Sequence, residues 1–411
     1  MDKQIRERIK QIQQGQIPIG YKRTEFGIFP CDWQIVELSK LLDFKNGVNA
    51  PKEKYNCGVK MISVMDILKE YPITYDSIIG KVDIEDSVLR EYDVAYGDIL
   101  FQRSSETFDD AGKANVYLDK KIATYSGFVI RGKKKFDYEP YFLNEMLRMP
   151  FVRKQIVRSA AGAQHINIGQ ESLENIVVCL ATKREQEIIS EILGKWDDAI
   201  KFVEKIIEDF QTKRRYLLKE VFEEKTESTK IRIGDFIQEQ SERNKTGITN
   251  IKSVSNKRGF IDQRNQFSKI VASADVSNYK VVKKHNIAYN PSRINVGSIA
   301  IYEDDEPGVV SPMYIVFSCI GISPKFLLLL LETDRGKYEI ESLLSGSVRN
   351  TLSYSDLCEV QLFLPHLDES IVLKTFSLIE TTIQMYENYL KRVKVQRSTL
   401  QRYLLNGMVR V

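Results

Sequence analysis

Two long, charged segments of the chain carry apolar residues at alternating intervals of three and four positions. In the first segment, only Lys213 interrupts the series Ile189, Ile192, Trp196, Ala199, Val203, Ile206, Phe210 and Leu217. In the second segment, only Arg397 interrupts the series Val372, Phe376, Ile379, Ile383, Tyr386, Leu390, Val393, Leu400 and Leu404. A seam of this period over about five heptads is typical of a coiled coil. The pattern predicts two helices of roughly 35–40 residues that pack antiparallel on each other within the chain. The alternative is that each helix pairs with another molecule.

The chain also repeats itself at about half its length. The stretch GAQHINIGQESLENIVVCL starts at Gly162 and matches GSVRNTLSYSDLCEVQLFL, which starts at Gly346, at an offset of 184 residues. The two seams superpose at an offset of 187, which fits a small insertion ahead of the second helix. A repeat of this length indicates two copies of one structural unit.

The segments ahead of the two helices have a different pattern. Residues 21–180 contain strand-like runs such as VKMISVMDI and ATYSGFVIRG, separated by Gly, Asn, Asp and Pro, and residues 231–364 contain similar runs. We therefore expect an α/β (α+β) fold with two pseudo-repeated globular domains, each followed by a long helix. The expected segments are an N-terminal helical segment at 1–20, a first globular domain at 21–182, a central long helix at 183–225, a linker with the second globular domain at 226–364, and a C-terminal long helix at 365–411.

Length and charge limit the classes of protein that the chain can belong to. With 411 residues the chain is too long for one ordinary core, which favours two or more domains. The net charge of +4 neither demands nor excludes nucleic acid, so a DNA-binding surface would have to be local.

Cysteine and histidine usage argues against metal and disulfide chemistry. Five scattered cysteines and three histidines match neither a zinc site nor a disulfide framework. Buried free thiols in a reducing cytoplasm are the expected state. The N-terminus is charged and does not resemble a secretory signal. The longest apolar run, Phe326 to Leu331, is far too short to span a bilayer. We expect a cytoplasmic protein that binds neither a metal nor a membrane.

The stretch AYNPSRINVGSI, residues 288–299, raises the question of catalysis. Methyltransferases that act on adenine place Asn or Asp, Pro, Pro and an aromatic residue beside the flipped base. Here Ser292 and Arg293 stand where the second proline and the aromatic residue are needed. The chain also lacks the Phe-x-Gly-x-Gly turn with which such enzymes bind S-adenosylmethionine. Methyl transfer by this chain is therefore disfavoured.

The repeat indicates a second role for the same stretch. Its counterpart is DILFQRSSE, with Ser104 opposite Ser292. In both copies an apolar strand ends in a polar loop that contains an arginine, Arg103 or Arg293. Arg, Asn, Gln and Ser are the side chains that reach phosphates and base edges of DNA. An ordinary connection between strands has the same composition, so both interpretations remain open at this point.

Four stretches together resemble the specificity (S) subunit of type I restriction-modification systems over nearly the full length of the chain. They are the opening GYKRTEFGIFPCDWQIVELSKLLDFKNG, the central KREQEIISEILGKWDDAIKFVEKIIEDFQTKRRYLLKEVF, the loop AYNPSRINVGSIAIY followed by VVSPMYIVF, and the ending LQRYLLNGM. The second long helix departs from the family's pattern. There PHLDESIVL replaces a more charged start, and Ile383 stands where Trp196 would have its match.

The resemblance implies a protein with no catalytic activity of its own. One target recognition domain would read each half of a bipartite, asymmetric DNA site. The two helices would hold the domains apart and bind two methyltransferase subunits through residues outside the seams, and motor-nuclease subunits would join that core. Added or deleted turns in either helix would then change the spacer between the half-sites. S-adenosylmethionine would belong to the methyltransferase subunits, so no cofactor is expected in this chain. The segment 1–20 would pack near the C-terminal end of the second helix.

We expect DNA contacts from polar and basic loop residues of both domains. In the first domain these are Lys45, Asn46, Arg103, Ser104, Lys113, Gln164, His165 and Asn167; in the second they are Arg243, Asn244, Lys257, Arg258, Asn290, Arg293, Asn295, Arg349 and Asn350. Each could instead be a solvated loop residue or a turn former. His165 lies opposite Arg349 in the repeat, and a shared positional role is expected for this pair rather than metal binding.

Two other functions remain open from the sequence. One is a coiled-coil adaptor without a role on DNA, which leaves the two polar-loop domains unexplained. The other is the DNA-recognition subunit of a different methyltransferase-based defence system, which the co-purifying methyltransferase would identify. The basic run Lys213-Arg214-Arg215 is expected on a solvated helix face.

Overall fold

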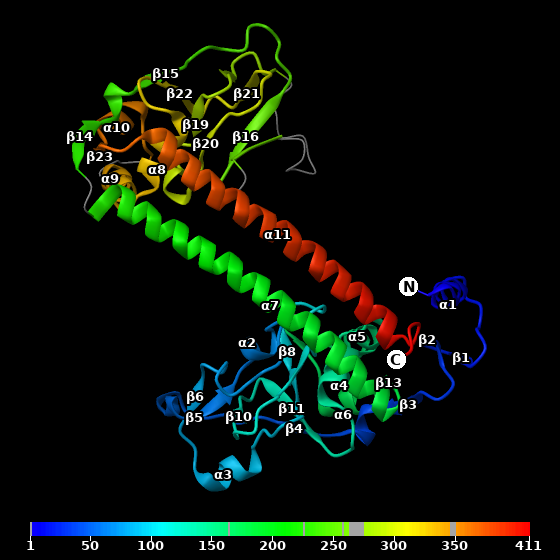
Figure 1. The fold of residues 1–411 in the computed structure, drawn as a ribbon. Helices are drawn as coiled ribbons and strands as arrows, with labels where there is room; N and C mark the ends of the chain where they lie inside the picture. Colours follow the sequence, from blue (N-terminus) through cyan, green and yellow to red (C-terminus); the bar gives the residue numbers. More distant parts are fainter. Residues whose placement is uncertain (1, 163–164, 225–226, 257–258, 263–274, 346–350) are drawn as a thin grey trace. The chain divides into compact units, whose positions relative to one another are not determined.

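The computed structural model describes residues 2–162, 165–224, 227–256, 259–262, 275–345 and 351–411. The chain divides into two compact units: the first is Met1–Glu204 with Tyr389–Val411, and the second is Lys205–Asn388. Two helices of 37 residues, α7 (Lys183–Lys219) and α11 (Glu369–Leu405), contribute one part to each unit (Figure 1). None of the helices in the described ranges is both long and apolar enough to cross a membrane.

The two long helices pack antiparallel on each other in both units. The contacts are the ion pairs Lys394–Glu204 (2.7 Å) and Arg397–Asp197 (2.9 Å) in the first unit, and the stacked rings of Phe210 and Tyr386 (centroids 6.2 Å apart) and the ion pair Arg214–Glu380 (2.9 Å) in the second. Within each unit, contacts further along α7 involve residues that come earlier in α11. This order is that of an antiparallel pair. The expected intramolecular pairing of the two helices is confirmed.

The buried seam follows the prediction on α11, but on α7 only Ile189 and Val203 of the predicted series are buried. The buried residues of α11 all belong to the predicted series or lie directly after it: Val372, Phe376, Ile379, Val393, Leu404 and Leu405. On α7 four positions were assigned wrongly, because Leu193, Ile200, Ile207 and Leu218 are buried in place of the predicted Ile192, Ala199, Ile206 and Leu217. Each of these positions offers two adjacent apolar residues, so spacing alone does not choose between them. Burying Ile200 instead of Ala199 removes more apolar surface from water.

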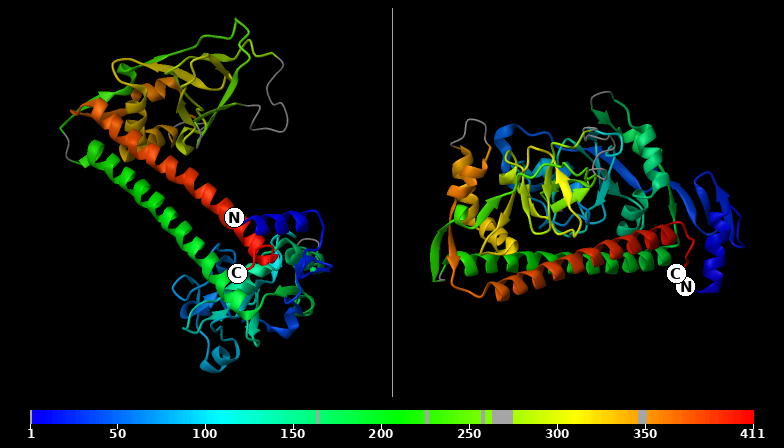
Figure 2. Two further views of the ribbon diagram at one scale, coloured as in Figure 1. Left: turned by 45° about the vertical axis from the view of Figure 1, so that its right-hand side comes forward. Right: turned by 90° about the horizontal axis from the view of Figure 1, so that it is seen from above.

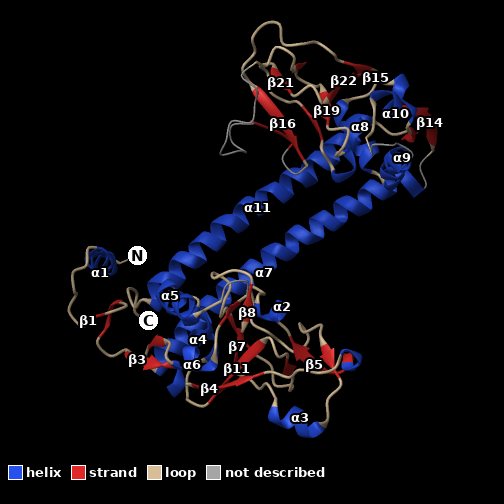
Figure 3. Ribbon diagram, turned by 180° about the vertical axis from the view of Figure 1, so that it is seen from behind, coloured by secondary structure: helices blue, strands red, loops and turns tan. Residues whose placement is uncertain are grey.

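The first unit contains two main sheets (Figure 3). A four-stranded antiparallel sheet has the order β4 (Leu42–Asn46), β11 (Val129–Lys134), β7 (Ile99–Gln102) and β9 (Ala114–Val116). A second sheet has the order β10 (Thr124–Tyr125), β5 (Tyr55–Ile62) and β6 (Lys81–Val82), with β10 and β5 parallel. Three short pairs are β1 (Tyr21–Thr24) with β2 (Gly27–Pro30), β3 (Gln34–Glu37) with β13 (Val177–Leu180), and β8 (Ser104–Ser105) with β12 (Ile166–Asn167).

Shorter helices complete the first unit. They are α1 (Lys3–Gln13), η1 (Leu38–Lys40), η2 (Lys52–Lys54), α2 (Val64–Ile67), α3 (Asp86–Glu91), α4 (Pro140–Leu147), α5 (Pro150–Ser159) and α6 (Gln170–Glu174). Alternation along β7 sends Ile99 and Phe101 into one apolar core and Leu100 into another. The first core includes side chains of α4 and α5 together with Leu404 at the end of α11. The C-terminal end of α11 is therefore part of the first unit's core.

The second unit has the same plan. Its four-stranded antiparallel sheet has the order β15 (Ile237–Glu239), β22 (Ile315–Cys319), β19 (Ile287–Tyr289) and β20 (Ile299–Ile301). The other sheet has the order β17 (Gly259–Asp262), β16 (Ile251–Ser255), β21 (Gly308–Val310) and β18 (Lys280–Val282), with β16 and β21 parallel. The remaining elements are η3 (Glu220–Glu224), β14 (Ser228–Arg232) paired with β23 (Gln361–Pro365), η4 (Ile233–Asp235), η6 (Ile294–Val296), α8 (Pro324–Glu332), α9 (Asp334–Ser345) and α10 (Tyr354–Glu359).

Matching hydrogen bonds confirm that the two units repeat one fold. In the first unit the Ile168 amide donates to the Arg103 carbonyl at 3.0 Å, and in the second the Leu352 amide donates to the Pro291 carbonyl at 3.1 Å. Ile168 and Leu352 differ by the offset of 184 found in the sequence. Arg103 therefore corresponds in position to Pro291, one residue ahead of the matched pair Ser104 and Ser292.

The N-terminal helix α1 lies near the C-terminal end of α11, as the resemblance implied (Figure 2). The Arg8 guanidinium lies 5.8 Å from the centroid of the Tyr21 ring. The Tyr21 hydroxyl in turn donates to the Gly407 carbonyl at 2.6 Å. Gly407 has φ +64°, and a Cβ there would lie 2.5 Å from Pro30, so this turn after α11 requires glycine.

One buried arginine in each unit joins both long helices to a shorter helix of the globular domain; we call this arrangement the arginine clamp. In the first unit Arg397 of α11 pairs with Asp197 of α7 at 2.9 Å and with Glu145 of α4 at 2.7 Å. In the second unit the arginine comes from α7 instead of α11. Arg214 of α7 pairs with Glu380 of α11 at 2.9 Å and with Glu332 of α8 at 2.7 Å.

The clamps correct the expectation for Arg214 and explain the charged interruption of the apolar series at Arg397. Arg214 is not on a solvated face, because its side chain is only 18% exposed, and Arg397, which interrupts the apolar series, is only 13% exposed. Burial alone would lower the pKa of Arg397, but Glu145 and Asp197 outweigh that effect and raise the pKa above its usual value. Both arginines are therefore charged parts of the interior.

Replacing Arg397 with methionine should destabilise the first unit by roughly 2–3 kcal/mol, because Glu145 would lose its main partner while 1% exposed. The loss should be at the low end for a buried pair, since Arg148 still lies 3.4 Å from Glu145. Urea unfolding followed by tryptophan fluorescence would report it, because Trp33 and Trp196 are the only tryptophans in the chain and both belong to the first unit.

Arg392 on the same helix is exposed and provides the matched control. Arg392→Met should change the free energy of unfolding by about 0.5 kcal/mol or less. Equal stabilities for the two variants would contradict the structural importance of the clamp.

Candidate nucleic-acid interface

In the first unit, the strand pair β8–β12 brings three predicted DNA-contacting residues together. Ser104 lies opposite Asn167 in this pair, and its hydroxyl donates to the Asn167 side-chain oxygen. The Asn167 amide nitrogen donates to the carbonyl of His165, whose side chain is exposed. A Cβ at Gly162 would lie 2.0 Å from that same carbonyl, so the close approach of these two residues requires glycine at position 162. The result is a polar surface next to the end of β7.

Arg103 lies beside this surface, and no carboxylate among the described residues pairs with it. Its backbone amide donates to the Phe128 carbonyl at 3.0 Å, and its guanidinium donates to the Gly127 carbonyl at 3.3 Å. The side chain is half-buried and forms no ion pair with any residue that the structure describes. A cation that is held in place but not neutralised is suited to a phosphate or to the acceptors of a guanine edge.

The other cations predicted for the first unit are already paired. Lys113 lies 2.5 Å from Asp110, and its ammonium group together with the Thr107 hydroxyl holds the pKa of Asp110 below its usual value. Lys45 lies 2.6 Å from Glu91 and 4.2 Å from the centroid of the Tyr92 ring. Asn46 follows Lys45 as the last residue of β4. In the sheet it pairs with Ile130, which in turn pairs with Phe101, so Asn46 lies at the same end of the strands as Arg103.

In the second unit, AYNPSRINVGSI forms the end of β19, the short helix η6 and the start of β20. Arg293 and Asn295 are exposed on this loop. Asn290 is 7% exposed, and its side-chain oxygen accepts from the Ser292 amide at 3.1 Å. Asn290 therefore shapes the turn that presents Arg293. Arg293 forms no ion pair with any part of the chain that the structure describes.

Asn244 is a correction to the predicted set. It is 2% exposed, and its side chain both donates to the Ile248 carbonyl and accepts from the Ile248 amide, each at 2.8 Å. These bonds hold a turn and leave the side chain unavailable to DNA. Arg243 is exposed and donates to the Asn278 carbonyl at 2.6 Å. Its backbone forms an isolated β-bridge with Lys280 of β18, which is not in the sheet that contains β19 and β20.

Five predicted residues lie outside the described residues: Gln164, Lys257, Arg258, Arg349 and Asn350. The described neighbour of the last two, Leu352, contacts Pro291 through its backbone. This is the same relation that Ile168 has to Arg103 in the first unit.

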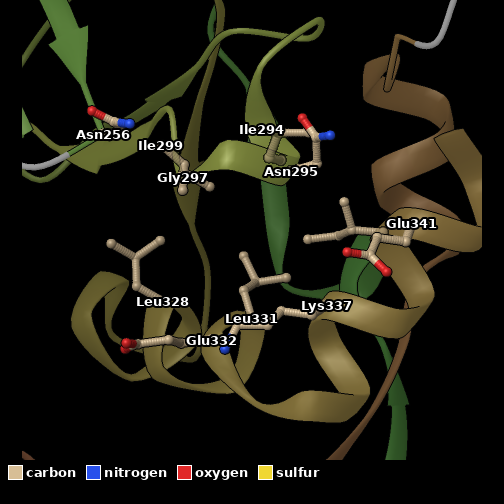
Figure 4. Close-up of a pocket in the computed structure, with 11 residues that line it drawn as sticks. Asn256, Ile294, Asn295, Gly297, Ile299, Leu328, Leu331, Glu332, Lys337 and Glu341 are labelled. Atoms are coloured by element: carbon tan, nitrogen blue, oxygen red, sulfur yellow. The ribbon is translucent and has the colours of Figure 1, made fainter. Parts of the chain in front are cut away.

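A cavity of about 340 Å³ beside η6 was not indicated by any motif in the sequence. Leu328 and Leu331 of α8 point into it toward Ile294 and Gly297 (Figure 4). Polar groups at its edge are Asn256, Asn295, Glu332, Lys337 and Glu341. The apolar lining is suited to packing rather than to catalysis.

The predicted chemistry of the cysteines holds only in part. All five are free, but Cys31 and Cys57 are exposed, contrary to the expectation of buried thiols. Cys179 is buried, and burial raises the pKa of its thiol to about 12. In the described part of the chain, no group of three or more His, Cys, Asp or Glu side chains could hold a metal ion.

Comparison with known proteins gives consistent relatives, although no protein-family model matches the chain. In Methanocaldococcus jannaschii, a protein assigned as the specificity subunit of the type I restriction enzyme MjaX is 24% identical over 432 residues, which cover 95% of this chain and 97% of that one. The MjaVIII specificity subunit of the same organism is 23% identical over 429 residues, covering 93% and 94%.

Solved structures show the same fold. The S subunit of a type I restriction-modification system from M. genitalium aligns with a TM-score of 0.55 and 16% identity, over 90% of this chain and 96% of that one. A chain from a study of complex assembly in a type I system aligns with a TM-score of 0.52 and 13% identity, over 93% and 99%. The comparisons thus confirm that the chain resembles the specificity subunits of type I restriction-modification systems over nearly its whole length.

Proposed function

We propose that this chain is the DNA-recognition subunit of a type I restriction-modification complex and that each unit reads one half of a bipartite site. One observation carries the proposal: in both units, the loop after equivalent strands presents an arginine that no carboxylate neutralises within the described residues. These arginines are Arg103 after β7 and Arg293 after β19. Sequence relatives that are specificity subunits support it.

The two half-sites should differ in sequence. The first loop combines Arg103 with Ser104 and Asn167, whereas the second combines Arg293 with Ser292 and Asn295. Arginine suits guanine, asparagine suits adenine and serine suits either base, so different placements of these groups select different bases. An asymmetric bipartite site follows.

The modification chemistry would belong to partner subunits in the cytoplasm. Asn290 is the residue that an adenine methyltransferase would aim at the flipped base, yet here its side-chain oxygen is bonded to the Ser292 amide. We therefore assign S-adenosylmethionine and base flipping to two methyltransferase subunits, with motor-nuclease subunits joining them for restriction. This chain would supply recognition without catalysis.

An apolar stripe on α11 is the proposed docking surface for a methyltransferase subunit. Ile371, Leu378 and Met385 follow at intervals of seven residues and are 64%, 69% and 56% exposed. All three belong to the second unit and lie outside the seam. Because both seams are satisfied within the chain, the stripe is available to another protein, and a self-pairing adaptor is disfavoured.

Arg103→Ala and Arg293→Ala should each weaken binding of the assembled complex to its site by roughly tenfold and relax base preference in one half-site only. The two variants should affect opposite halves. The assay is binding to duplexes that carry every single-base change in the site.

Lys45→Ala is the matched control, because Lys45 is already paired with Glu91. It should leave base preference unchanged. A loss of preference with Lys45→Ala as large as that with Arg103→Ala, or an equal effect of one arginine variant on both halves, would contradict the assignment.

Leu378→Asp combined with Met385→Asp should abolish co-purification of a methyltransferase subunit, because the stripe could no longer be buried without burying a charge. Ile320→Asp, at a residue that is also in the second unit and 53% exposed, should have no effect on assembly. Normal assembly of the double variant would remove α11 from the proposed docking surface.

A further inference from the structure

Each unit holds one large apolar side chain outward on a tight turn next to its polar loop. In the first unit the turn is Ser126-Gly127-Phe128-Val129, in which the Val129 amide donates to the Ser126 carbonyl at 2.9 Å. In the second it is Ser311-Pro312-Met313-Tyr314, in which the Tyr314 amide donates to the Ser311 carbonyl at 3.0 Å. Phe128 and Met313 occupy the same position of the same turn.

The sheet registers show independently that the two turns are equivalent. Each turn follows the strand that pairs parallel with its neighbour, β10 with β5 in the first unit and β21 with β16 in the second. Each then leads into the strand that pairs with β7 or β19. Phe128 and Met313 are 65% and 55% exposed.

The first turn is closely packed against the neighbouring chain, and Phe128 is exposed on it. A Cβ at Gly127 would lie 1.9 Å from the Asn49 side chain, and one at Gly47 would lie 2.2 Å from the Ser126 carbonyl. The turn is thus pressed against residues 47–49. A large ring that is held in solvent by a tightly packed turn has no folding role of its own.

Both apolar residues lie directly beside the proposed reading loops. The Arg103 amide bonds to the Phe128 carbonyl at 3.0 Å. In the second unit Tyr289 lies opposite Ile315, and extending this register by two residues sets Met313 opposite Pro291, next to Ser292. Single exposed apolar residues are common on protein surfaces. The general frequency of exposed apolar residues does not explain why a large one recurs at the same turn position in two units of different sequence.

We propose that Phe128 and Met313 each contact the C5 methyl group of a thymine in the half-site read by their own unit. This inference rests on the proposed function and adds to it a specificity-determining residue in each unit. Arginine, asparagine and serine can read the hydrogen-bonding edges of bases, but only an apolar group gains from contact with the thymine methyl. Each reading surface would then combine a charged, a polar and an apolar contact.

The test uses the complete complex with its methyltransferase subunits and duplexes in which the thymines of the site are replaced one at a time by deoxyuridine, which lacks the methyl group. One replacement should weaken binding of the unaltered complex by about fivefold. Phe128→Ala should weaken binding to the all-thymine duplex by a similar factor and should be insensitive to that replacement. Met313→Ala should do the same for a thymine in the other half-site, and Phe128→Leu should retain most of the affinity.

Several outcomes would overturn the inference. One is that Phe128→Ala leaves DNA binding unchanged, and another is that the losses of binding free energy from Phe128→Ala and from deoxyuridine add independently. The others are a half-site that contains no thymine, and a variant that loses its partner subunits instead of its DNA affinity. In each of these cases the unaltered complex would still discriminate its site from other DNA. If the unaltered complex showed no sequence preference, the proposed function would fail and the inference with it.

Discussion

The arginine clamps are the constraint on which the arrangement of each unit depends. Apolar seams hold the long helices together, but they are non-directional and fix orientation weakly. Arg397 in the first unit and Arg214 in the second each bind two carboxylates through ion pairs of defined geometry, one on the other long helix and one on a helix of the globular domain. A buried charge is tolerated only when its partners are in place. Each clamp therefore fixes the angle at which a domain, with its reading loop, meets the helix pair of its own unit.

The repeat and the polar loops after β7 and β19 could be predicted from the sequence because each appears as a local pattern of residues. The offset of 184 residues that relates Ile168 to Leu352 reappears as matching hydrogen bonds, and the loops after β7 and β19 each carry an arginine, which is half-buried at Arg103 and exposed at Arg293. The phase of α7 could not be predicted, since Ala199 and Ile200 are both apolar. The clamps could not be predicted either, because Glu145 and Arg397 meet only after the chain has folded across 252 positions. Composition likewise did not separate Asn244, which holds a turn, from the exposed Asn295.

In the proposed reading loops, some residues hold the backbone in shape and others face outward. Asn290, Gly162 and the packed turn at Gly127 are used internally to hold shape. This leaves Arg103, Arg293 and the two apolar residues Phe128 and Met313 facing outward from defined backbone positions. Because the backbone hydrogen bonds match between the units while Phe128 and Met313 differ and the two arginines stand at different positions, one fold can present two different surfaces. That arrangement suits a protein which must distinguish two unlike half-sites.

The most direct test of this account is long-read mapping of methylated adenines in a host that expresses the chain with its methyltransferase subunit, and in the same host without the chain. The account predicts a bipartite motif with two different halves that appears only when the chain is present. Methylation that persists unchanged without the chain, or a motif whose halves are the same sequence in inverted order, would contradict the central claim that two unlike units read two unlike half-sites.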